Sequence, residues 1–316
     1  MSRTKFHNVD GILVGKYFPE ESVREALTYK PRPDDVFIVS YPKCGTTWLQ
    51  HIVYHIVSKG TPPESAEEFD SKTPFFEMKG QEVIDNLLRP AAIKTHLPFD
   101  KQPYTKDAKY IYITRNPYDC CVSFFYHMRH LLPLCDYQTK TFSEFFEDFL
   151  LGNVSFGCYV DHLLSWYAHR DEPNVLFLTY EGLKRDVRGS IQKIADFLGK
   201  EYGNDLRRDH TIIERIVELT SFENMQKVVN PEIRNFGKKF TGIPLEKMPL
   251  WMQRITKSMG DTVKEPFVGD FVRKGKVGDW RDHFSAEEVQ RMKEWIKKGT
   301  EGSDVIDLWK DLDFTY

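Results

Sequence analysis

The sequence predicts a single α/β domain in which a central parallel sheet carries helices on both faces. Short apolar runs of strand length alternate with longer segments whose apolar residues recur every three or four positions. This alternation is typical of parallel sheets, because two parallel strands need a crossover between them that is usually helical. The chain shows no internal repeat and no low-complexity segment, so we expect residues 1–316 to form one domain.

The composition argues against two classes of partner. Hydrophobic residues make up 41% of the chain and aromatic residues 14%, which is enough for a sizeable core. The net charge of −3 favours neither nucleic acid nor an anionic membrane as a partner. No apolar run approaches the roughly 20 residues that span a bilayer, and the N-terminus lacks a signal-peptide core. We therefore expect a cytoplasmic protein whose five cysteines are reduced thiols, without disulfides or a metal site.

One stretch joins a strand to a helix through a short loop with the character of a phosphate site. Residues 36–39 are apolar, which predicts a buried strand, and Thr46 and Thr47 open an apolar helix. The free N–H groups of a helix N-terminus attract anions, and Lys43 adds a positive charge. The loop is P-loop-like, but Lys43 precedes Gly45, so it departs from the G-x-x-x-x-G-K-[ST] pattern.

Other strands end in similar groups. Further strands are predicted at 91–95, 110–114 and 174–180, and the first two lead directly into His96 and Arg115. Carboxyl ends of parallel strands share one edge of the sheet, where ligands bind. We therefore expect both side chains to meet the lysine of the phosphate loop in one crevice.

The second half of the chain is expected to hold more helices and one irregular segment. Helices are predicted within the aromatic-rich stretch 142–169 and, after a Ser-x-x-Glu capping box, at 285–298. Residues 223–272 lose the periodicity and mix Pro, Gly and Lys, which predicts a long loop or lid with a short helix. Directly after it, the basic stretch 273–275 contains a glycine and is suited to wrap a phosphate.

Four stretches, in this order along the chain, resemble motifs of the cytosolic sulfotransferases. Residues 41–48 (YPKCGTTW) resemble the 5′-phosphosulfate loop of that family, and residues 94–98 (KTHLP) fall where it keeps a catalytic histidine. Residues 112–117 (YITRNP), continuing to Ser123, resemble its 3′-phosphate strand and helix, and residues 273–280 its C-terminal cofactor loop. The similarity covers nearly the whole chain.

The resemblance implies a single α/β domain that uses 3′-phosphoadenosine 5′-phosphosulfate (PAPS) as donor and releases adenosine 3′,5′-bisphosphate (PAP), without a metal. By position it assigns donor binding to Lys43, Cys44, Gly45, Thr46, Thr47, Trp48, Arg115, Ser123, Tyr180, Thr220, Phe222, Phe271, Arg273, Lys274 and Gly275.

Sulfuryl transfer needs a base for the acceptor proton and positive charge for the leaving phosphate. His96 is the natural base, since an unperturbed imidazole titrates near neutral pH. Lys43 is placed to neutralise the leaving oxygen, and Lys94, two residues before His96, shares its strand face. The resemblance adds Ser123 as a partner that bonds Lys43 when no acceptor is present.

Each of these residues has a plainer interpretation when taken alone. A histidine after a strand is usually structural, an arginine such as Arg115 often forms an ion pair, and Arg273–Lys274 resembles a solvated charge run. Cys44 is either an oxidisable thiol beside Lys43 or a passive small side chain. Two rival functions are a P-loop kinase and a non-catalytic PAPS-binding protein. A P-loop kinase would need a Gly-Lys-Thr order and a metal-binding acid, and this sequence has neither. A protein that only binds PAPS would be expected to lack Lys43 or His96, and both are present.

The acceptor and the assembly state are less constrained. Phe75 and Phe76, at the end of the loop-like segment 61–80, and Phe142 are either core residues or walls of an apolar pocket. As pocket walls they favour a phenol or a catecholamine-like amine as acceptor, with a steroid alcohol as an alternative. The family's dimer motif is poorly matched at 281–290, so both a monomer and a homodimer are open.

Overall fold

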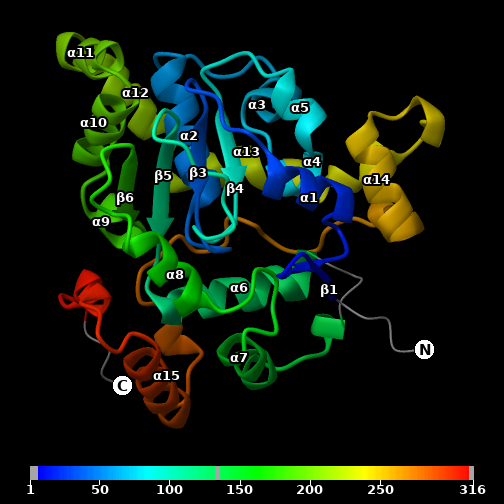
Figure 1. The fold of residues 1–316 in the computed structure, drawn as a ribbon, viewed down its shortest axis with the longest axis vertical. Helices are drawn as coiled ribbons and strands as arrows, with labels where there is room; N and C mark the ends of the chain where they lie inside the picture. The colour runs from blue at the N-terminus through cyan, green and yellow to red at the C-terminus, as the bar shows by residue number, and fades with distance from the viewer. Residues whose placement is uncertain (1–5, 132–135, 313–316) are drawn as a thin grey trace.

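The computed structural model describes residues 6–131 and 136–312 and confirms the predicted α/β architecture. Its centre is a four-stranded parallel sheet in the order β4-β3-β5-β6 (Figure 1). The strands are β3 (Val36–Val39), β4 (Ala92–Thr95), β5 (Lys109–Thr114) and β6 (Val175–Thr179). In register, Val39 of β3 pairs with Thr95 of β4 and with Tyr112 of β5, so these strands end at one edge.

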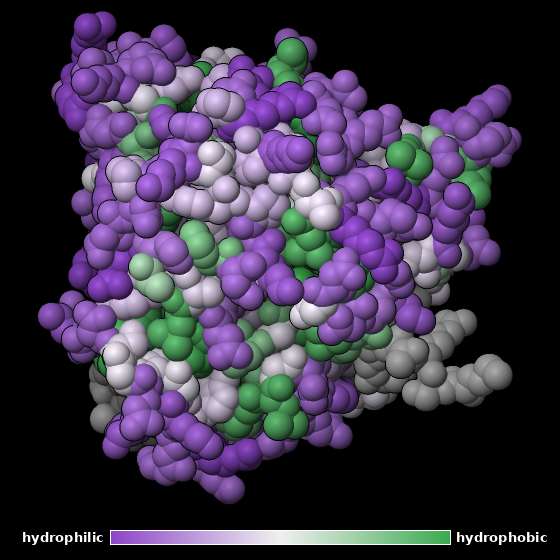
Figure 2. Space-filling view, viewed as in Figure 1, coloured by the Kyte–Doolittle hydropathy of each residue, from purple (hydrophilic) through white to green (hydrophobic). Residues whose placement is uncertain are grey.

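Alternating side chains divide the sheet into two packed faces. On β3, Phe37 and Val39 join a core rich in aromatic residues, whereas Ile38 joins a mainly aliphatic core on the other face. The aliphatic face is covered by α2 (Thr46–Val57), α10 (Val187–Leu198) and α12 (His210–Leu219). Helices α6 (Pro117–Leu131), α8 (Tyr159–Tyr167) and α15 (Ala286–Gly299) contribute to the aromatic core. Hydrophilic side chains dominate the outer surface on the face shown in Figure 2.

Several elements surround this core. The chain begins with an antiparallel hairpin of β1 (Phe6–Val9) and β2 (Ile12–Gly15). The capping box predicted for the last long helix is confirmed, because Ser285 and Glu288 cap α15. Segment 61–80, expected as a loop, contains a helix at Ala66–Lys72 that Ser65 caps. That helix is α3, and the other α-helices outside segment 223–272 are α1 (Glu20–Thr28), α4 (Phe76–Lys79), α5 (Gln81–Asp85), α7 (Phe142–Leu150), α9 (Tyr180–Arg185) and α11 (Lys200–Arg208).

The segment 223–272 differs from the long loop that the sequence predicts, because much of it is helical. It contains α13 (Phe222–Arg234), α14 (Leu250–Met259) and three 3₁₀ turns, at Phe236–Phe240, Leu245–Lys247 and Gly260–Lys264. A small core packs the turns at 236–240 and 260–264 against α14, and it consists of Phe240, Met248, Met252, Ile255 and Val263. Phe222, Met225, Val229 and Ile233 of α13 do recur at a helical spacing, whereas α14 and the 3₁₀ turns are short and separated by Pro and Gly, which hides a 3.6-residue period there.

Helix α14 packs beside α1 and α4 at one side of the molecule (Figure 1). The guanidinium of Arg254 donates two hydrogen bonds to the carboxylate of Glu25 on α1, of 2.6 and 2.8 Å. Both side chains are largely buried, so this bidentate pair is a specific attachment.

Candidate active site

The loop between β3 and α2 has the backbone shape that an anion site requires. Lys43 and Gly45 have φ angles of 71° and 109°, in the left-handed region. A Cβ atom on Gly45 would lie 3.0 Å from the ring of Tyr180, so glycine is also the residue that fits. No side chain caps α2 at Gly45, which leaves the N-terminus of the helix available to a ligand.

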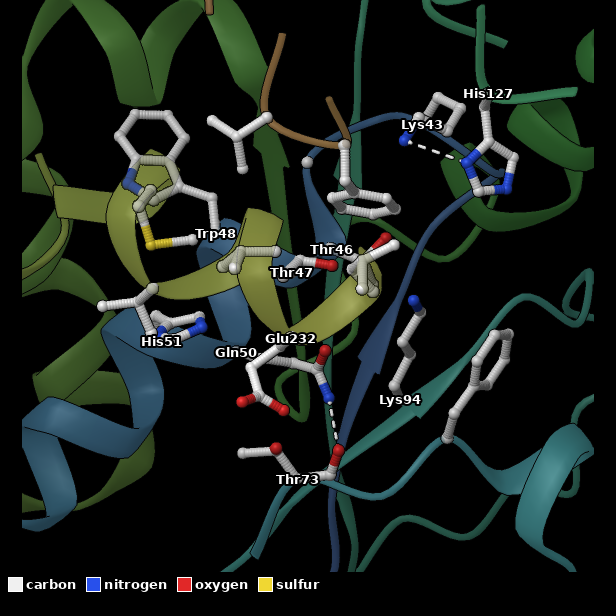
Figure 3. Close-up of a pocket in the computed structure, with 18 of the residues that line it drawn as sticks. Lys43, Thr46, Thr47, Trp48, Gln50, His51, Thr73, Lys94, His127 and Glu232 are labelled. Carbon is white, nitrogen blue, oxygen red and sulfur yellow. Dashed lines mark hydrogen bonds between the residues drawn. The ribbon is translucent and has the colours of Figure 1, made fainter. Parts of the chain in front are cut away.

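The carboxyl edge of the sheet opens into a cavity of about 860 Å³. Lys43, Lys94, His96 and Arg115 all line it, so the expected convergence of three strand ends is present. Figure 3 shows the side chains of Lys43 and Lys94 in this cavity. All but one of the residues assigned to the donor by resemblance also line this cavity: Lys43, Gly45, Thr46, Thr47, Trp48, Arg115, Ser123, Tyr180, Thr220, Phe222, Phe271, Arg273, Lys274 and Gly275.

His96 is held in one tautomer. Its Nδ1 atom lies 2.7 Å from the carbonyl oxygen of Ser40, and a carbonyl only accepts, so Nδ1 carries the proton. Nε2 then keeps its lone pair. Burial, and next the charge of Lys94, lower the pKa of His96 well below its ordinary value, which keeps the ring neutral. The rings of Phe75 and Phe156 meet the imidazole at 5.0 and 5.2 Å between centroids.

Two lysines place positive charge in this desolvated site. Burial, and next the neighbouring charges of Lys94 and Arg115, lower the pKa of Lys43 to about 7. Burial lowers the pKa of Lys94 to about 8, although Glu77 opposes the shift. Desolvation disfavours the charged forms of the two lysines, whereas a nearby negative charge favours them. An anionic ligand between these side chains would therefore restore their charged forms.

The structure fits a phosphate-bearing ligand at the other end of the cavity. Arg115 donates from Nη2 to the carbonyl oxygen of Lys276 at 3.1 Å, and its buried Nε has no hydrogen-bond partner in residues 6–131 and 136–312. Gly275 has a φ of 57°, and a Cβ there would lie 2.4 Å from the ring of Phe222. Glycine therefore lets the basic loop pack closely on the Phe222 ring at the cavity, and the unpaired guanidinium N–H of Arg115 is a donor for a ligand oxygen.

Aromatic and basic side chains complete the donor end. Trp48 donates its indole N–H to the carbonyl oxygen of Thr220 at 2.9 Å, which fixes the plane of the indole. Arg273 and Lys274 both bind the carboxylate of Asp279 in the structure, the latter at 2.6 Å. The two cations are therefore positioned before any ligand arrives.

Three predicted site residues lie outside the cavity. Phe76 packs against Tyr29 at 5.1 Å, and Phe142 packs against Phe284 at 4.9 Å. Phe76 is a core residue and Phe142 is half-buried against the core, so only Phe75 of the three expected aromatic residues lines the cavity. Cys44 is fully buried with its sulfur 3.7 Å from that of Cys120, and burial raises the pKa of its thiol. This supports a passive thiol over an oxidisable one.

Sequence reasoning missed several cavity residues. His127 on α6 has its Nδ1 atom 3.4 Å from Nζ of Lys43 (Figure 3). It follows Ser123 by four residues and so lies on the same helix face, a signal that was available in the sequence. Tyr17, Phe18 and Phe156 also line the cavity and gave no such signal.

Two features are absent from the described part of the chain. No group of three or more His, Cys, Asp or Glu side chains within residues 6–131 and 136–312 is arranged to hold a metal ion. In the same residues, no helix has the length and apolarity needed to cross a membrane.

The fold and the site define an α/β enzyme that acts on a phosphate-bearing ligand at the carboxyl edge of a parallel sheet. Residues 33–304 match the family model of the sulfotransferase domain. The chain is 34% identical over 290 residues to sulfotransferase 1C2 of Rattus norvegicus, covering 88% of this chain and 87% of the relative. It is also 34% identical over 293 residues to human sulfotransferase 1E1, covering 89% and 88%. The chain therefore belongs to the sulfotransferase family and is a PAPS-dependent sulfotransferase.

Solved structures agree. Mouse sulfotransferase SULT7A1, complexed with PAP, superposes with a TM-score of 0.72 at 29% identity and covers 98% of each chain. Retinol dehydratase in complex with androsterone and the inactive cofactor PAP superposes with a TM-score of 0.66 at 26% identity, covering 94% of this chain and 89% of that one.

Proposed function

We propose that the protein transfers a sulfuryl group from PAPS to the hydroxyl or amine of a small apolar acceptor and releases PAP. The observation that carries this proposal is the neutral His96 in the same cavity as Lys43, with Nδ1 bonded to Ser40 and Nε2 left as acceptor. Two structural neighbours that match over almost their full length were solved with PAP.

The donor end is assigned to the phosphate loop, Arg115 and the basic loop. PAP carries about four negative charges at neutral pH. Lys43, Arg115, Arg273 and Lys274 supply an equal number of positive charges around the cavity. The indole of Trp48 and the ring of Phe222 are assigned to the adenine, whose π-face suits aromatic side chains.

Sulfuryl transfer breaks the bond between sulfur and the bridging oxygen and forms a bond between sulfur and the acceptor oxygen. In our proposal His96 Nε2 takes the acceptor proton as this bond forms. Lys43 stabilises the charge left on the 5′-phosphate, a role of the kind that typically contributes about 3 kcal/mol. Lys94, on the same edge, holds sulfuryl oxygens, and Ser123 remains a second candidate partner of Lys43.

The acceptor end is walled by apolar side chains from three parts of the chain. Phe75 contacts the His96 ring and Phe18 contacts Phe75, while α13 and α14 contribute Met225, Ile255 and Met259 to the lining of the same cavity. Because methionine side chains adapt their shape, this wall suits apolar acceptors of some length. We propose apolar alcohols and phenols as the acceptor class. Androsterone and retinol, present with retinol dehydratase in its solved complexes, belong to the first group.

The test is an incubation with radiolabelled PAPS and a panel of phenols, catecholamine-like amines, steroid alcohols and isoprenoid alcohols. Labelled product from apolar hydroxyl compounds is the expected result. His96→Ala run in parallel reports whether transfer depends on the base. If PAP binds tightly but no acceptor becomes labelled, the protein is a PAP-binding protein and the transferase proposal is wrong.

A further inference from the structure

Three side chains from distant parts of the chain meet around one ammonium group. Lys43 Nζ lies 3.7 Å from the centre of the Phe271 ring and 3.4 Å from Nδ1 of His127 (Figure 3). His127 in turn meets the Phe271 ring at 5.7 Å between centroids, with the planes nearly perpendicular. The ammonium is thus bounded by an aromatic face and a ring nitrogen.

His127 is suited to accept a hydrogen bond from Lys43. Burial, and next the charges of Lys43 and Lys94, lower the pKa of His127 well below its ordinary value, so the ring is neutral. A neutral imidazole offers one nitrogen as acceptor, and an ammonium has donors only. Nδ1 of His127 therefore accepts from Lys43.

The hydroxyl of Ser123 lines the same cavity from one turn earlier on α6, but the only hydrogen bond of Lys43 Nζ within the described residues is with His127. The two candidate partners share one face of the helix, and only one of them is engaged. This differs from the pairing that the family resemblance implies.

We propose that His127 is a positioning residue that holds Lys43 at the donor phosphate and keeps it charged, and that it takes the place of the bond to Ser123 that the resemblance implies when no acceptor is present. The inference rests on the proposed sulfuryl transfer. His127 touches neither donor nor acceptor in this role, and acts through Lys43 alone.

The groups facing Lys43 give the proposal a pH signature. Lys94, Arg115 and Arg273 disfavour its charged form, whereas Cys120 and the lone pair of His127 favour it. The pKa of Lys43 is about 7, and losing the lone pair of His127 would lower it further. As the pH is raised, activity that needs the Lys43 ammonium would then begin to fall at a lower pH than in the wild type.

The experiment compares His127→Phe, which keeps a ring but removes the acceptor, with His127→Asn, whose amide oxygen replaces Nδ1. At saturating acceptor we expect His127→Phe to lower kcat/KM for PAPS about tenfold. Because kcat/KM reports the groups of the free enzyme, its alkaline limb should move down by about one pH unit. His127→Asn should retain most activity and the wild-type limb. His169→Phe, a histidine outside the cavity, serves as the matched control.

Calorimetric PAP binding across pH 6–9 separates this proposal from the proposed function. If wild-type protein binds PAP but sulfates nothing, the transferase proposal fails, and the pH at which PAP affinity declines still reports on His127. The inference is overturned if His127→Phe keeps the wild-type kcat/KM for PAPS and its pH dependence, or if His127→Asn behaves like His127→Phe. It is equally overturned if Ser123→Ala reproduces the shift and His127→Phe does not.

Discussion

The Nδ1 atom of His96 donates its proton to the carbonyl oxygen of Ser40, 2.7 Å away at the end of the neighbouring strand. A backbone carbonyl cannot be protonated at neutral pH or rotate away from its strand. The tautomer of His96 is thereby set by the sheet itself, with Nε2 left as proton acceptor. The pairing of β3 with β4 therefore sets the tautomer in which His96 can act as a base.

Replacing His96 should therefore affect chemistry and leave donor binding intact. We expect His96→Ala to lower kcat by about 10²- to 10⁴-fold, the range for losing a general base. PAP affinity, measured by calorimetry, should stay within about twofold of wild type, because the ring lies at the acceptor end. Full activity in this variant would exclude His96 as the base.

Lys43 should reduce stability while it supports activity. The folded protein holds the Lys43 proton less tightly than the unfolded chain, with a pKa of about 7 against an ordinary 10.5. Below pH 7 the full free-energy cost of burying the charged lysine reduces the stability of the fold, and stability rises with pH between those two pKa values. At pH 6 we expect Lys43→Met to abolish transfer but to raise stability by about 1 to 2 kcal/mol.

The gain should appear as a Tm increase of roughly 2 to 4 °C in calorimetric scans without ligand. It should disappear near pH 10, where the wild-type lysine is neutral. The exposed Lys297→Met is the matched control and should leave Tm unchanged at both pH values. A lower Tm for Lys43→Met at pH 6 contradicts the expectation.

Gly275 should be needed for donor binding. Its φ of 57° is strained for other residues, and a Cβ would collide with the Phe222 ring at 2.4 Å. We expect Gly275→Ala to weaken PAP binding about tenfold or more, because the strain costs about 1 to 3 kcal/mol. Gly302→Ala is a fair control, since it has a φ of 81° and no atom within 4 Å of the added Cβ. Equal PAP affinity in both variants would show that the close approach is unimportant.

Substitutions at two adjacent phenylalanines should separate an effect on acceptor binding from an effect on core packing. Phe75 lines the cavity beside His96, whereas Phe76 is 2% exposed and packs in the core. Phe75→Ala should raise KM for the acceptor severalfold with little change in PAP affinity. Phe76→Ala should destabilise the fold by about 3 to 5 kcal/mol while the surviving folded enzyme keeps its acceptor KM. Urea unfolding and steady-state kinetics measure the two effects, and a reversal of the pattern would refute the assignment.

The sheet and the phosphate loop could be predicted because their signals are local. The apolar run at 36–39 and the Lys-Cys-Gly-Thr-Thr turn occupy consecutive residues, and His96 and Arg115 directly follow their strands. His127 could not be paired with Lys43, since the two lie 84 residues apart and meet only through the packing of α6. Phe76 and Phe142 show a similar limit, because composition does not tell whether an aromatic ring faces the core or a cavity.

The helical content of 223–272 was missed for another reason. Helix α14 is short and is stabilised by the small core and by the Arg254–Glu25 pair to α1, whereas α13 carries apolar residues at a helical spacing that could have been read from the sequence. Tertiary contacts decide the conformation of such short helices.

The small core formed by Phe240, Met248, Met252, Ile255 and Val263 gives residues 236–264 a degree of independence. Segments that carry their own packing can be exchanged or lengthened without repacking the sheet. The donor-binding loops and His96 are contributed by the sheet and its neighbouring loops, outside this unit. Ile255 and Met259 of this unit line the cavity, so exchanging the unit would change the cavity wall while the strand ends that lead into His96 and Arg115 stay in place.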